Sequence, residues 1–240
     1  MAQADWNLCG SSLGSGSVVV VETAAFPVAD GAADTFAQLM NSLTTSIGVV
    51  AYFHNGSGFA PTTSGGLVQG CIKKGVSAGT AGWSPFLMAT LQGTGTVADV
   101  AYILGLSNTN PARLVLRKGA LTGGLPDVLP PENLGDPLVQ GVIARSSDVF
   151  AIDEWLHLRL QVRVNGNLDA VITCERNDLT LHDASSPVWQ AIPGIAQFVD
   201  DGAGAVTGSP SLQSGRFGYG CWFGDTQRRA LFDEIYLEAD

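Results

Sequence analysis

The sequence predicts an all-β protein, an antiparallel β-sandwich, and three features of its last third support this. Residues 155–164 alternate apolar and polar side chains, which is the period of a strand with one buried face. The pair Asn165-Gly166 follows and favours the positive φ angles of a tight two-residue hairpin, with 167–175 as the returning strand. Residues 215–224 and 229–237 form a second pair of strand-like blocks, which we expect to pair with each other.

The rest of the chain predicts further strands between Gly- and Pro-rich gaps, at 47–54, 67–73, 85–91, 97–104, 113–117 and 138–144. Residues 34–43 carry apolar side chains at helical spacing and predict either a short amphipathic helix or a loop. Residues 118–137 contain Gly-Gly and Pro-Pro and predict a long surface loop. We expect 179–210 to be an irregular cover over the end of the sandwich, with one helical turn at 194–199.

The chain is expected to divide into an arm and one domain. Residues 1–32 predict an extended, flexible N-terminal arm, because they are mostly small and polar and include a Gly- and Ser-rich stretch at 10–17. Residues 33–240 fit a single β-sandwich domain with long loops, since all-β domains of about 200–250 residues are common. No internal repeat or linker divides this range.

Charged residues make up only 14% of the chain, against roughly 25% in ordinary soluble domains. Either the 30 glycines, together with Ser and Thr, supply the surface polarity, or much of the surface is buried against other subunits, because interface cores are depleted in charge. The net charge of −10 and the scattered basic residues argue against nucleic acid as a partner.

No apolar run approaches the length of a membrane span, and the first residues lack the basic segment and apolar core of a secretory leader. We therefore expect a product made in the cytoplasm that does not contact a membrane. The cysteines lie too far apart for a zinc pattern, and their disulfide state stays open: Cys9, Cys71, Cys174 and Cys221. Cys174 and Cys221 fall within strand patterns and are expected to be buried.

The chain is not expected to be an enzyme. Residues 10–14 match Gly-x-Ser-x-Gly, but they lack the preceding strand and the following helix that a nucleophile elbow needs. Adjacent acids at 153–154, 200–201 and 233–234 would point to opposite faces of a strand, whereas glycoside hydrolysis needs two acids that face each other across a sugar.

Few side chains stand out as ligand contacts. The three histidines have no metal-ligand spacing, and His157 is expected on the partly exposed face of its strand. Oxygen-bearing side chains alternate around the predicted hairpin turn, as calcium favours, although the turn accounts for them without an ion: Asn165, Asn167 and Asp169. No other cofactor is expected. Trp83, in a glycine-rich segment, and His54 are candidate contacts for a sugar.

Three segments carry a resemblance to a known fold family: Glu154-Trp-Leu-His-Leu-Arg-Leu160, Ser214-Gly-Arg-Phe-Gly-Tyr-Gly220 and Arg229-Ala-Leu-Phe-Asp-Glu-Ile235. They resemble the concanavalin A-like, laminin-G-like jelly rolls over about residues 65–238, and the wider pattern is similar to virion proteins of tailed bacteriophages. The Asp and Asn loop through which lectins of this fold bind calcium and sugar has no residue-by-residue match in this chain. This departure favours a structural use of the fold.

These observations predict a non-enzymatic structural component of a tailed-phage virion, located in the neck, the tail or the capsid decoration. Such a subunit would form homo-oligomers and contact other virion proteins. The alternative is a carbohydrate-binding, lectin-like module that attaches to a host-surface glycan through Trp83, His54 or the loop at 121–137.

Overall fold

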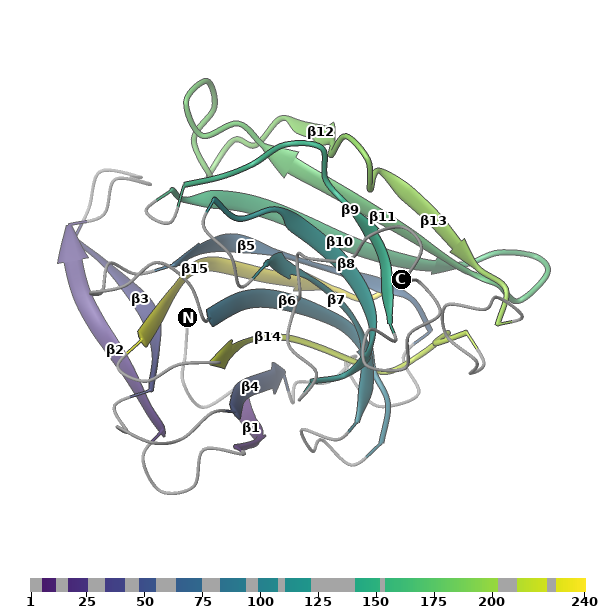
Figure 1. Ribbon diagram of the computed structural model, residues 1–240, viewed down its shortest axis with the longest axis horizontal. Coiled ribbons are helices and arrows are strands. Elements are labelled where there is room, and N and C mark those ends of the chain that lie inside the picture. The colour runs from purple at the N-terminus through teal and green to yellow at the C-terminus, as the bar shows by residue number, and fades with distance from the viewer. Residues whose placement is uncertain are drawn as a thin grey trace.

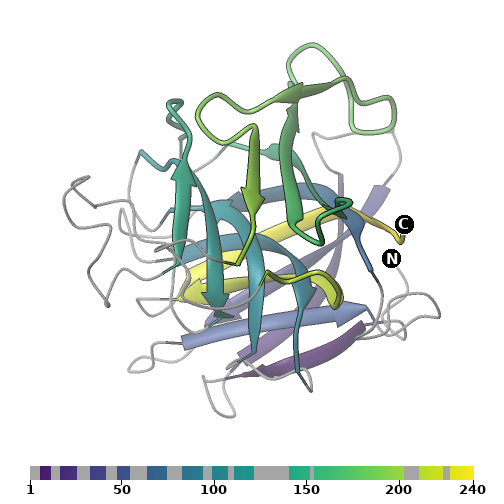
Figure 2. The same cartoon turned by 90° about the vertical axis from the view of Figure 1, so that its right-hand side faces the viewer.

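The computed structural model describes residues 6–11, 17–25, 33–41, 48–54, 64–74, 83–93, 99–107, 111–121, 141–151, 154–202, 211–223 and 228–240. Every secondary-structure element in these ranges is a β-strand, and the strands form two antiparallel sheets that pack face to face (Figure 1, Figure 2). The prediction of an all-β antiparallel sandwich is therefore confirmed.

The first sheet, which we call sheet A, has seven strands. Its spatial order is β1 (Trp6–Ser11), β4 (Gly48–His54), β14 (Arg216–Phe223), β6 (Trp83–Leu91), β7 (Val100–Leu106), β8 (Leu114–Ala120) and β9 (Val142–Arg145). Its central strands are almost continuously apolar, which is the pattern of strands that are buried on both faces.

The second sheet, sheet B, has eight strands. Its spatial order is β12 (Trp189–Ala191), β11 (Ala170–Asn177), β10 (Leu156–Val164), β5 (Gly66–Lys74), β15 (Arg228–Glu238), β3 (Ala33–Asn41) and β2 (Ser17–Ala25), and β13 (Gln197–Asp200) also pairs with β11. β12 and β13 therefore lie along the same edge of β11.

The β10–β11 hairpin is confirmed, but its turn is longer than predicted. The two strands pair from His157 opposite Asn177 to Val164 opposite Ala170, so five residues, 165–169, connect them. The Asn165 side chain closes this connection, because its Oδ1 accepts hydrogen bonds from the backbone N–H groups of residues 167 (2.9 Å) and 169 (3.0 Å). The prediction of a tight two-residue turn at Asn165-Gly166 is therefore wrong.

The second predicted hairpin is also wrong, although both of its strands exist. β14 lies in sheet A between β4 and β6, whereas β15 lies in sheet B between β5 and β3. The chain therefore crosses from one sheet to the other between these strands. Strand pattern alone does not reveal this, because periodicity identifies a strand and not its partner.

Strand pairing defines three segments that the sequence does not predict as strands. Within the expected arm, β1 pairs with β4 and β2 pairs with β3, so these two stretches are strands of the sheets. Residues 33–41 form β3, which corrects the predicted helix or loop. Within the expected cover, β12 and β13 pair with β11, which corrects the helical turn, whereas residues 178–188 contain turns and no strand, as an irregular cover would. Pairing in a sheet satisfies the backbone groups of segments whose local sequence preference is weak. The division of the chain into domains stays a prediction.

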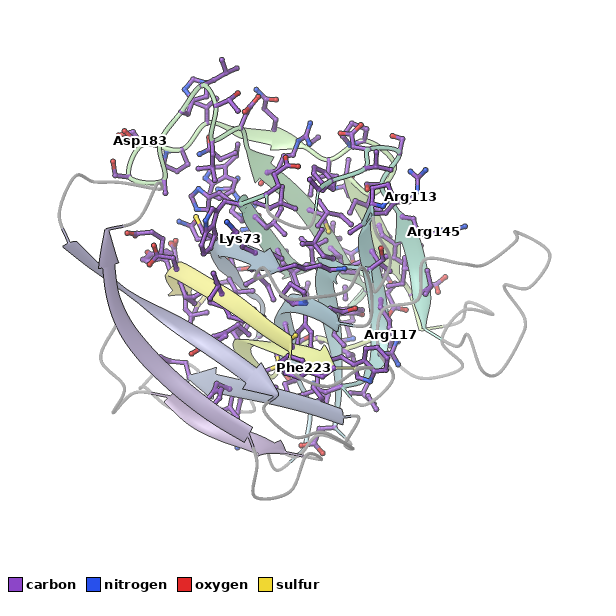
Figure 3. The ribbon with its side chains drawn as sticks, turned by 60° about the vertical axis from the view of Figure 1, so that its left-hand side comes forward. Lys73, Arg113, Arg117, Arg145, Asp183 and Phe223 are labelled. Atoms are coloured by element: carbon purple, nitrogen blue, oxygen red, sulfur yellow. The ribbon has the colours of Figure 1, made fainter. Side chains whose placement is uncertain are left out.

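The main core lies between the two sheets and draws large apolar side chains from both. Phe223, labelled in Figure 3, belongs to it together with Val68, Ile72, Leu87, Leu104, Leu158, Leu160, Ile172, Phe217 and Phe232. Cys174 and Cys221 are fully buried in the same core, as predicted.

A polar group of three residues ties the two sheets together inside this core. Lys118 Nζ of β8 lies 2.6 Å from Asp200 Oδ2 of β13, and both side chains are almost completely buried. The Tyr102 hydroxyl of β7 donates to the same oxygen at 2.5 Å and accepts a hydrogen bond from the Leu212 N–H at 3.1 Å. Burial and the hydrogen bond to Asp200 raise the pKa of Tyr102. Such a group is stable only because each charge is paired within hydrogen-bonding distance.

Sheet A also carries a second apolar cluster on the face that points away from sheet B. It comprises Val49, Ala51, Phe53, Phe86, Met88, Leu91, Ala101, Ile103, Val115, Leu121 and Val142. Gly218 of β14 lies on this face between β4 and β6, where a Cβ atom would collide with the Tyr52 carbonyl oxygen of β4 and would lie 2.8 Å from Met88 Cε of β6. This face is therefore part of the interior of the protein, since these residues are at most 6% exposed.

Candidate functional site

The outer face of sheet B is polar where that of sheet A is apolar. Because side chains alternate along a strand, the residues of β10 opposite to its core leucines share this face. One row across neighbouring strands runs Tyr236, Gln69, Arg159 and Glu175, and the next along β10 includes Gln161 and Thr173. Among the described residues, this face is where a polar ligand would find hydrogen-bonding partners.

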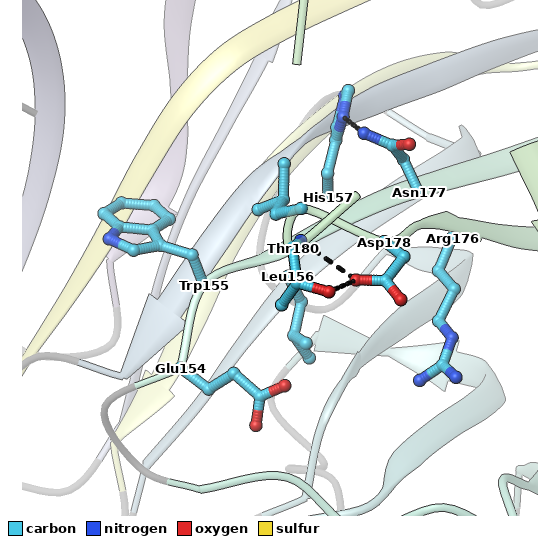
Figure 4. A pocket seen from close by; sticks show the side chains of 9 residues that line it. Glu154, Trp155, Leu156, His157, Arg176, Asn177, Asp178 and Thr180 are labelled. Carbon is cyan, nitrogen blue, oxygen red and sulfur yellow. Dashed lines mark hydrogen bonds between the residues drawn. The ribbon is translucent and has the colours of Figure 1, made fainter. Parts of the chain in front are cut away.

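A hollow of about 480 Å³ opens at the end of the sandwich where β10 begins and β11 ends (Figure 4). We call it the end hollow. Its lining residues are Glu154, Trp155, Leu156, His157, Arg176, Asn177, Asp178, Leu179 and Thr180. They come from the segment before β10, the last residues of β11 and the turn after it, so the hairpin register places both groups side by side.

The end hollow combines hydrogen-bond acceptors and donors. Figure 4 shows the carboxylates of Glu154 and Asp178 and the guanidinium of Arg176 on the same side of the strands, around Leu156. Arg176 Nη2 also lies 3.1 Å from Asp148 Oδ2, which holds the guanidinium in place. Three carboxylates and one guanidinium give this region a net negative charge.

Local turns fix the two carboxylates of the end hollow. Asp178 Oδ1 accepts hydrogen bonds from the Thr180 hydroxyl at 2.6 Å and from the Thr180 N–H at 2.9 Å. These bonds lower the pKa of Asp178, so it is ionised at neutral pH. Glu154 Oε2 accepts a hydrogen bond from the Ala151 N–H at 3.1 Å, which holds this exposed side chain beside the hollow.

Trp155 supplies an aromatic surface at the flank of the end hollow. Its side chain is half-buried, and the Lys73 ammonium lies 5.7 Å from the ring centroid. Lys73 belongs to β5, and Trp155 directly precedes β10, which pairs with β5 (Figure 3 labels Lys73). A cation over an indole ring is a stabilising contact and keeps the ring in one orientation.

His157 is fully buried, which corrects the prediction of a partly exposed position. The ring of Trp189 packs edge-on against it, with 4.7 Å between the ring centroids, and Asn177 Nδ2 lies 3.4 Å from His157 Nδ1. Asn177 also binds the following loop, because its Nδ2 donates to the carbonyls of residues 182 (3.1 Å) and 183 (3.2 Å). Burial lowers the pKa of His157 to about 4.

The structure does not bring the two predicted sugar contacts together. His54 is the last residue of β4 and is half-buried, whereas Trp83 is the first residue of β6 and pairs with Phe223, which pairs with Gly48. Six residues of β4, about 20 Å of strand, separate the two positions. The side chain of Trp83 and residues 122–137 of the predicted binding loop lie outside what the structure describes. His54 does not line the end hollow.

The acidic pairs are dispersed as well. Asp233 is buried on β15, where its Oδ1 accepts the Glu234 N–H at 2.9 Å, while Glu154 is exposed at the end hollow. Asp200 belongs to the buried polar group, and Asp153 lies outside the described residues. Within the described ranges, these acids do not face each other across one cleft.

The candidate calcium ligands are used by the hairpin turn. Asn165 Oδ1 accepts the two backbone hydrogen bonds described above, and its Nδ2 donates to Asp169 Oδ2 at 2.9 Å. In the part of the chain that the structure describes, no three His, Cys, Asp or Glu side chains gather in a way that could hold a metal ion. The same part contains no helix with the length and apolar character needed to cross a bilayer.

Arg176, Asp178 and Thr180 were not identified from the sequence as site residues. They lie at the end of a predicted strand and in a segment read as an irregular cover, and their polar character is ordinary for such positions. The register of the β10–β11 hairpin could have predicted their position, because it places the residues after β11 beside those before β10.

No protein-family model and no curated protein sequence matches the chain. Solved structures do match its fold. The exoplasmic/lumenal domain of VIP36, in its Ca²⁺/Man3GlcNAc-bound form, is similar at 9% identity with a TM-score of 0.50, over 97% of this chain and 82% of that one.

Two further structures match at lower TM-scores. The carbohydrate binding module CBM66 from Bacillus subtilis is 12% identical, with a TM-score of 0.47 over 93% of this chain and 96% of that one. The CBM2 module of the evolved Dit of Lactobacillus casei BL23 phage J-1 is 11% identical, with a TM-score of 0.40 over 98% and 96%. Together with the two antiparallel sheets, the likeness to the VIP36 domain shows that this protein has a lectin-type, concanavalin A-like jelly-roll fold.

Proposed function

We propose that the protein binds carbohydrate without catalysing its turnover, and that the end hollow is its binding site. The observation that carries this proposal is the set of groups in the hollow. Glu154 and Asp178 accept hydrogen bonds, Arg176 donates them, and Leu156 and Trp155 offer apolar surface. A sugar ring presents hydroxyl groups around its rim and C–H groups on its faces, so it fits a site that alternates polar and apolar contacts.

The charge of the end hollow narrows the ligand. Its carboxylates would repel an acidic sugar and attract the hydroxyl or amino groups of a neutral or amino sugar. The same fold accommodates a mannose-containing saccharide in the VIP36 domain, which is compatible with this class of ligand. Asp178 is held in its ionised form by two hydrogen bonds from Thr180, so it does not offer the proton that a general acid supplies in glycoside hydrolysis, which supports binding without turnover.

A matched pair of variants tests the site. Glu154→Gln removes one charged acceptor from the end hollow, and Glu238→Gln removes another exposed carboxylate, at the C-terminal end of β15. On an array of neutral, amino and acidic saccharides, we expect Glu154→Gln to weaken binding about 10- to 100-fold, as the loss of a charged hydrogen bond does. Glu238→Gln should bind as the unmodified protein does.

Either of two results would refute the proposal: no saccharide on the array binds, or the two variants bind equally. Turnover of a bound saccharide, measured as new reducing ends, would contradict the non-enzymatic part alone.

A structural role in a tailed-phage virion is the second candidate. It is supported by the low charge of the chain and by exposed apolar side chains in the loop after β11, where Leu181 is 70% exposed and Val188 is 46% exposed. In this role the protein is a neck, tail or decoration subunit that contacts copies of itself and other virion proteins. Peptide mass spectrometry of purified particles tests it, and a stable monomer that is absent from the particles would contradict it.

A further inference from the structure

A second hollow, of about 330 Å³, lies at the other end of the β10–β11 pair. Its lining residues are Gln161, Arg163, Val164, Asn165, Val171, Thr173 and Gln197. Gln161 of β10 is opposite Thr173 of β11, which is opposite Gln197 of β13, so one row of polar side chains crosses three adjacent strands. We call this the donor-lined hollow.

Positive charge and hydrogen-bond donors dominate the donor-lined hollow. Arg163 is the only charged residue among the described residues that line it, and the side chain is 67% exposed, with Asp240 Oδ2 at 3.9 Å from Nε. With its amide oriented to suit its neighbours, Gln161 accepts hydrogen bonds from Arg163 Nε (3.2 Å) and Nη2 (3.1 Å). This arrangement holds the guanidinium beside the hollow and leaves the amide N–H groups of Gln161 as donors.

The remaining polar groups are available to a ligand. The side chains of Thr173 and Gln197 form no hydrogen bond within the described part of the chain, whereas the amide of Asn165 is used by the hairpin turn. Val164 and Val171 supply apolar surface. The site therefore offers a guanidinium, two amides and a hydroxyl over aliphatic side chains, and its described lining residues include no carboxylate.

We infer that the donor-lined hollow binds the carboxylate of an acidic sugar residue, such as a uronic acid. A guanidinium matches the two oxygens of a carboxylate, and such charge-assisted bonds are stronger than those to a neutral hydroxyl. The neighbouring amides and hydroxyl suit the ring hydroxyls of the same residue. This inference rests on the proposed function for the class of ligand, but it concerns a different site with the opposite charge from the end hollow.

The test compares digalacturonate with the neutral digalactoside of the same linkage, using the full chain. In NMR titrations, digalacturonate should shift the backbone amides of Val171, Thr173 and Gln197 and should bind at least about tenfold more tightly than the digalactoside. Arg163→Gln should remove this preference, and its exposure makes a folding defect unexpected. Arg145→Gln, in the edge strand β9 of sheet A and outside the lining of both hollows, should leave the preference intact.

Equal binding of both disaccharides, or an unchanged preference in Arg163→Gln, would overturn the inference. Equally tight binding of an acidic peptide, such as tetraglutamate, would also overturn it, because the site would then read charge and not sugar. The two proposals fail separately. If the preference for the acidic disaccharide is absent, the effect of Glu154→Gln still tests the end hollow. If the end hollow binds no saccharide, shifts at Val171, Thr173 and Gln197 still report binding in the donor-lined hollow.

Discussion

The outer faces of the two sheets contrast sharply, although both belong to strands of similar length in the same sandwich. On sheet A this face holds a second apolar cluster that includes Phe86, Met88 and Ile103, and all three are at most 1% exposed. On sheet B the corresponding face carries Arg159, Gln161 and other polar groups that are in part accessible.

The contrast shows why the polar candidate sites lie where they do. An apolar face that is excluded from water contributes to stability through burial and offers few partners to a polar ligand. A face with alternating donors and acceptors contributes less to stability but can exchange its water for a ligand. Among the described residues, both hollows lie along the β10–β11 pair of sheet B.

The largest expected effect tests whether the outer face of sheet A is buried in the interior of the protein. Phe86→Ala should lower the free energy of unfolding by about 3–5 kcal/mol, because it removes a buried aromatic ring and leaves a cavity. Gln161→Ala on the outer face of sheet B should change it by less than about 0.5 kcal/mol. Urea unfolding of the two variants measures both values, and similar losses would abolish the distinction between the faces.

The intermediate effect concerns His157, which is buried although it lies on the polar outer face of sheet B. Its pKa is lowered to about 4 from the ordinary value of 6.5, so the unfolded chain takes up a proton first as the pH falls. Stability from this group is therefore complete above about pH 6.5 and falls by about 3 kcal/mol by pH 4.

The non-titrating variant His157→Gln isolates this contribution. Between pH 7 and pH 4, the free energy of unfolding of the unmodified protein should fall by about 3 kcal/mol more than that of the variant. Parallel pH profiles of the two proteins would show that His157 is accessible to water and that the outer face of sheet B has no buried portion at this row.

The smallest expected effect comes from the ion pair at the centre of the polar face. Arg159 Nε donates to Glu175 Oε2 at 2.7 Å, and both side chains remain 20–24% exposed. A double-mutant cycle with Arg159→Met and Glu175→Gln should give a coupling energy of about 0.5–1 kcal/mol, which 0.5 M salt reduces. A coupling of several kcal/mol would mean that this face is buried like that of sheet A.

The same contrast separates what the sequence predicts well from what it does not. β10 alternates strictly and was assigned correctly with its partner β11, because one face is apolar and the other is polar. The runs in β6 and β7 are apolar on both faces, so they predict strands but carry no information about which face meets the other sheet. The strand pattern also carries no information about partners, so the sequence does not predict that the chain crosses from sheet A to sheet B between β14 and β15.

The candidate site was less predictable than the fold. Glu154 and Asp178 converge because the hairpin register and two local turns bring them together, and no short motif encodes this. The glycine-rich segment around Trp83 predicts an exposed sugar contact in a loop, yet Trp83 begins a strand in sheet A. Residue type indicates what a side chain can bind, whereas its neighbours in space come from strand order.

The buried group of Lys118, Asp200 and Tyr102 has a consequence for recognition. Asp200 ends β13, the strand that also carries Gln197 into the donor-lined hollow. One wall of that hollow is thus anchored to the opposite sheet through the interior. A ligand that enters it meets a preorganised wall and loses little affinity to ordering the protein, so association should be fast and nearly free of conformational adjustment.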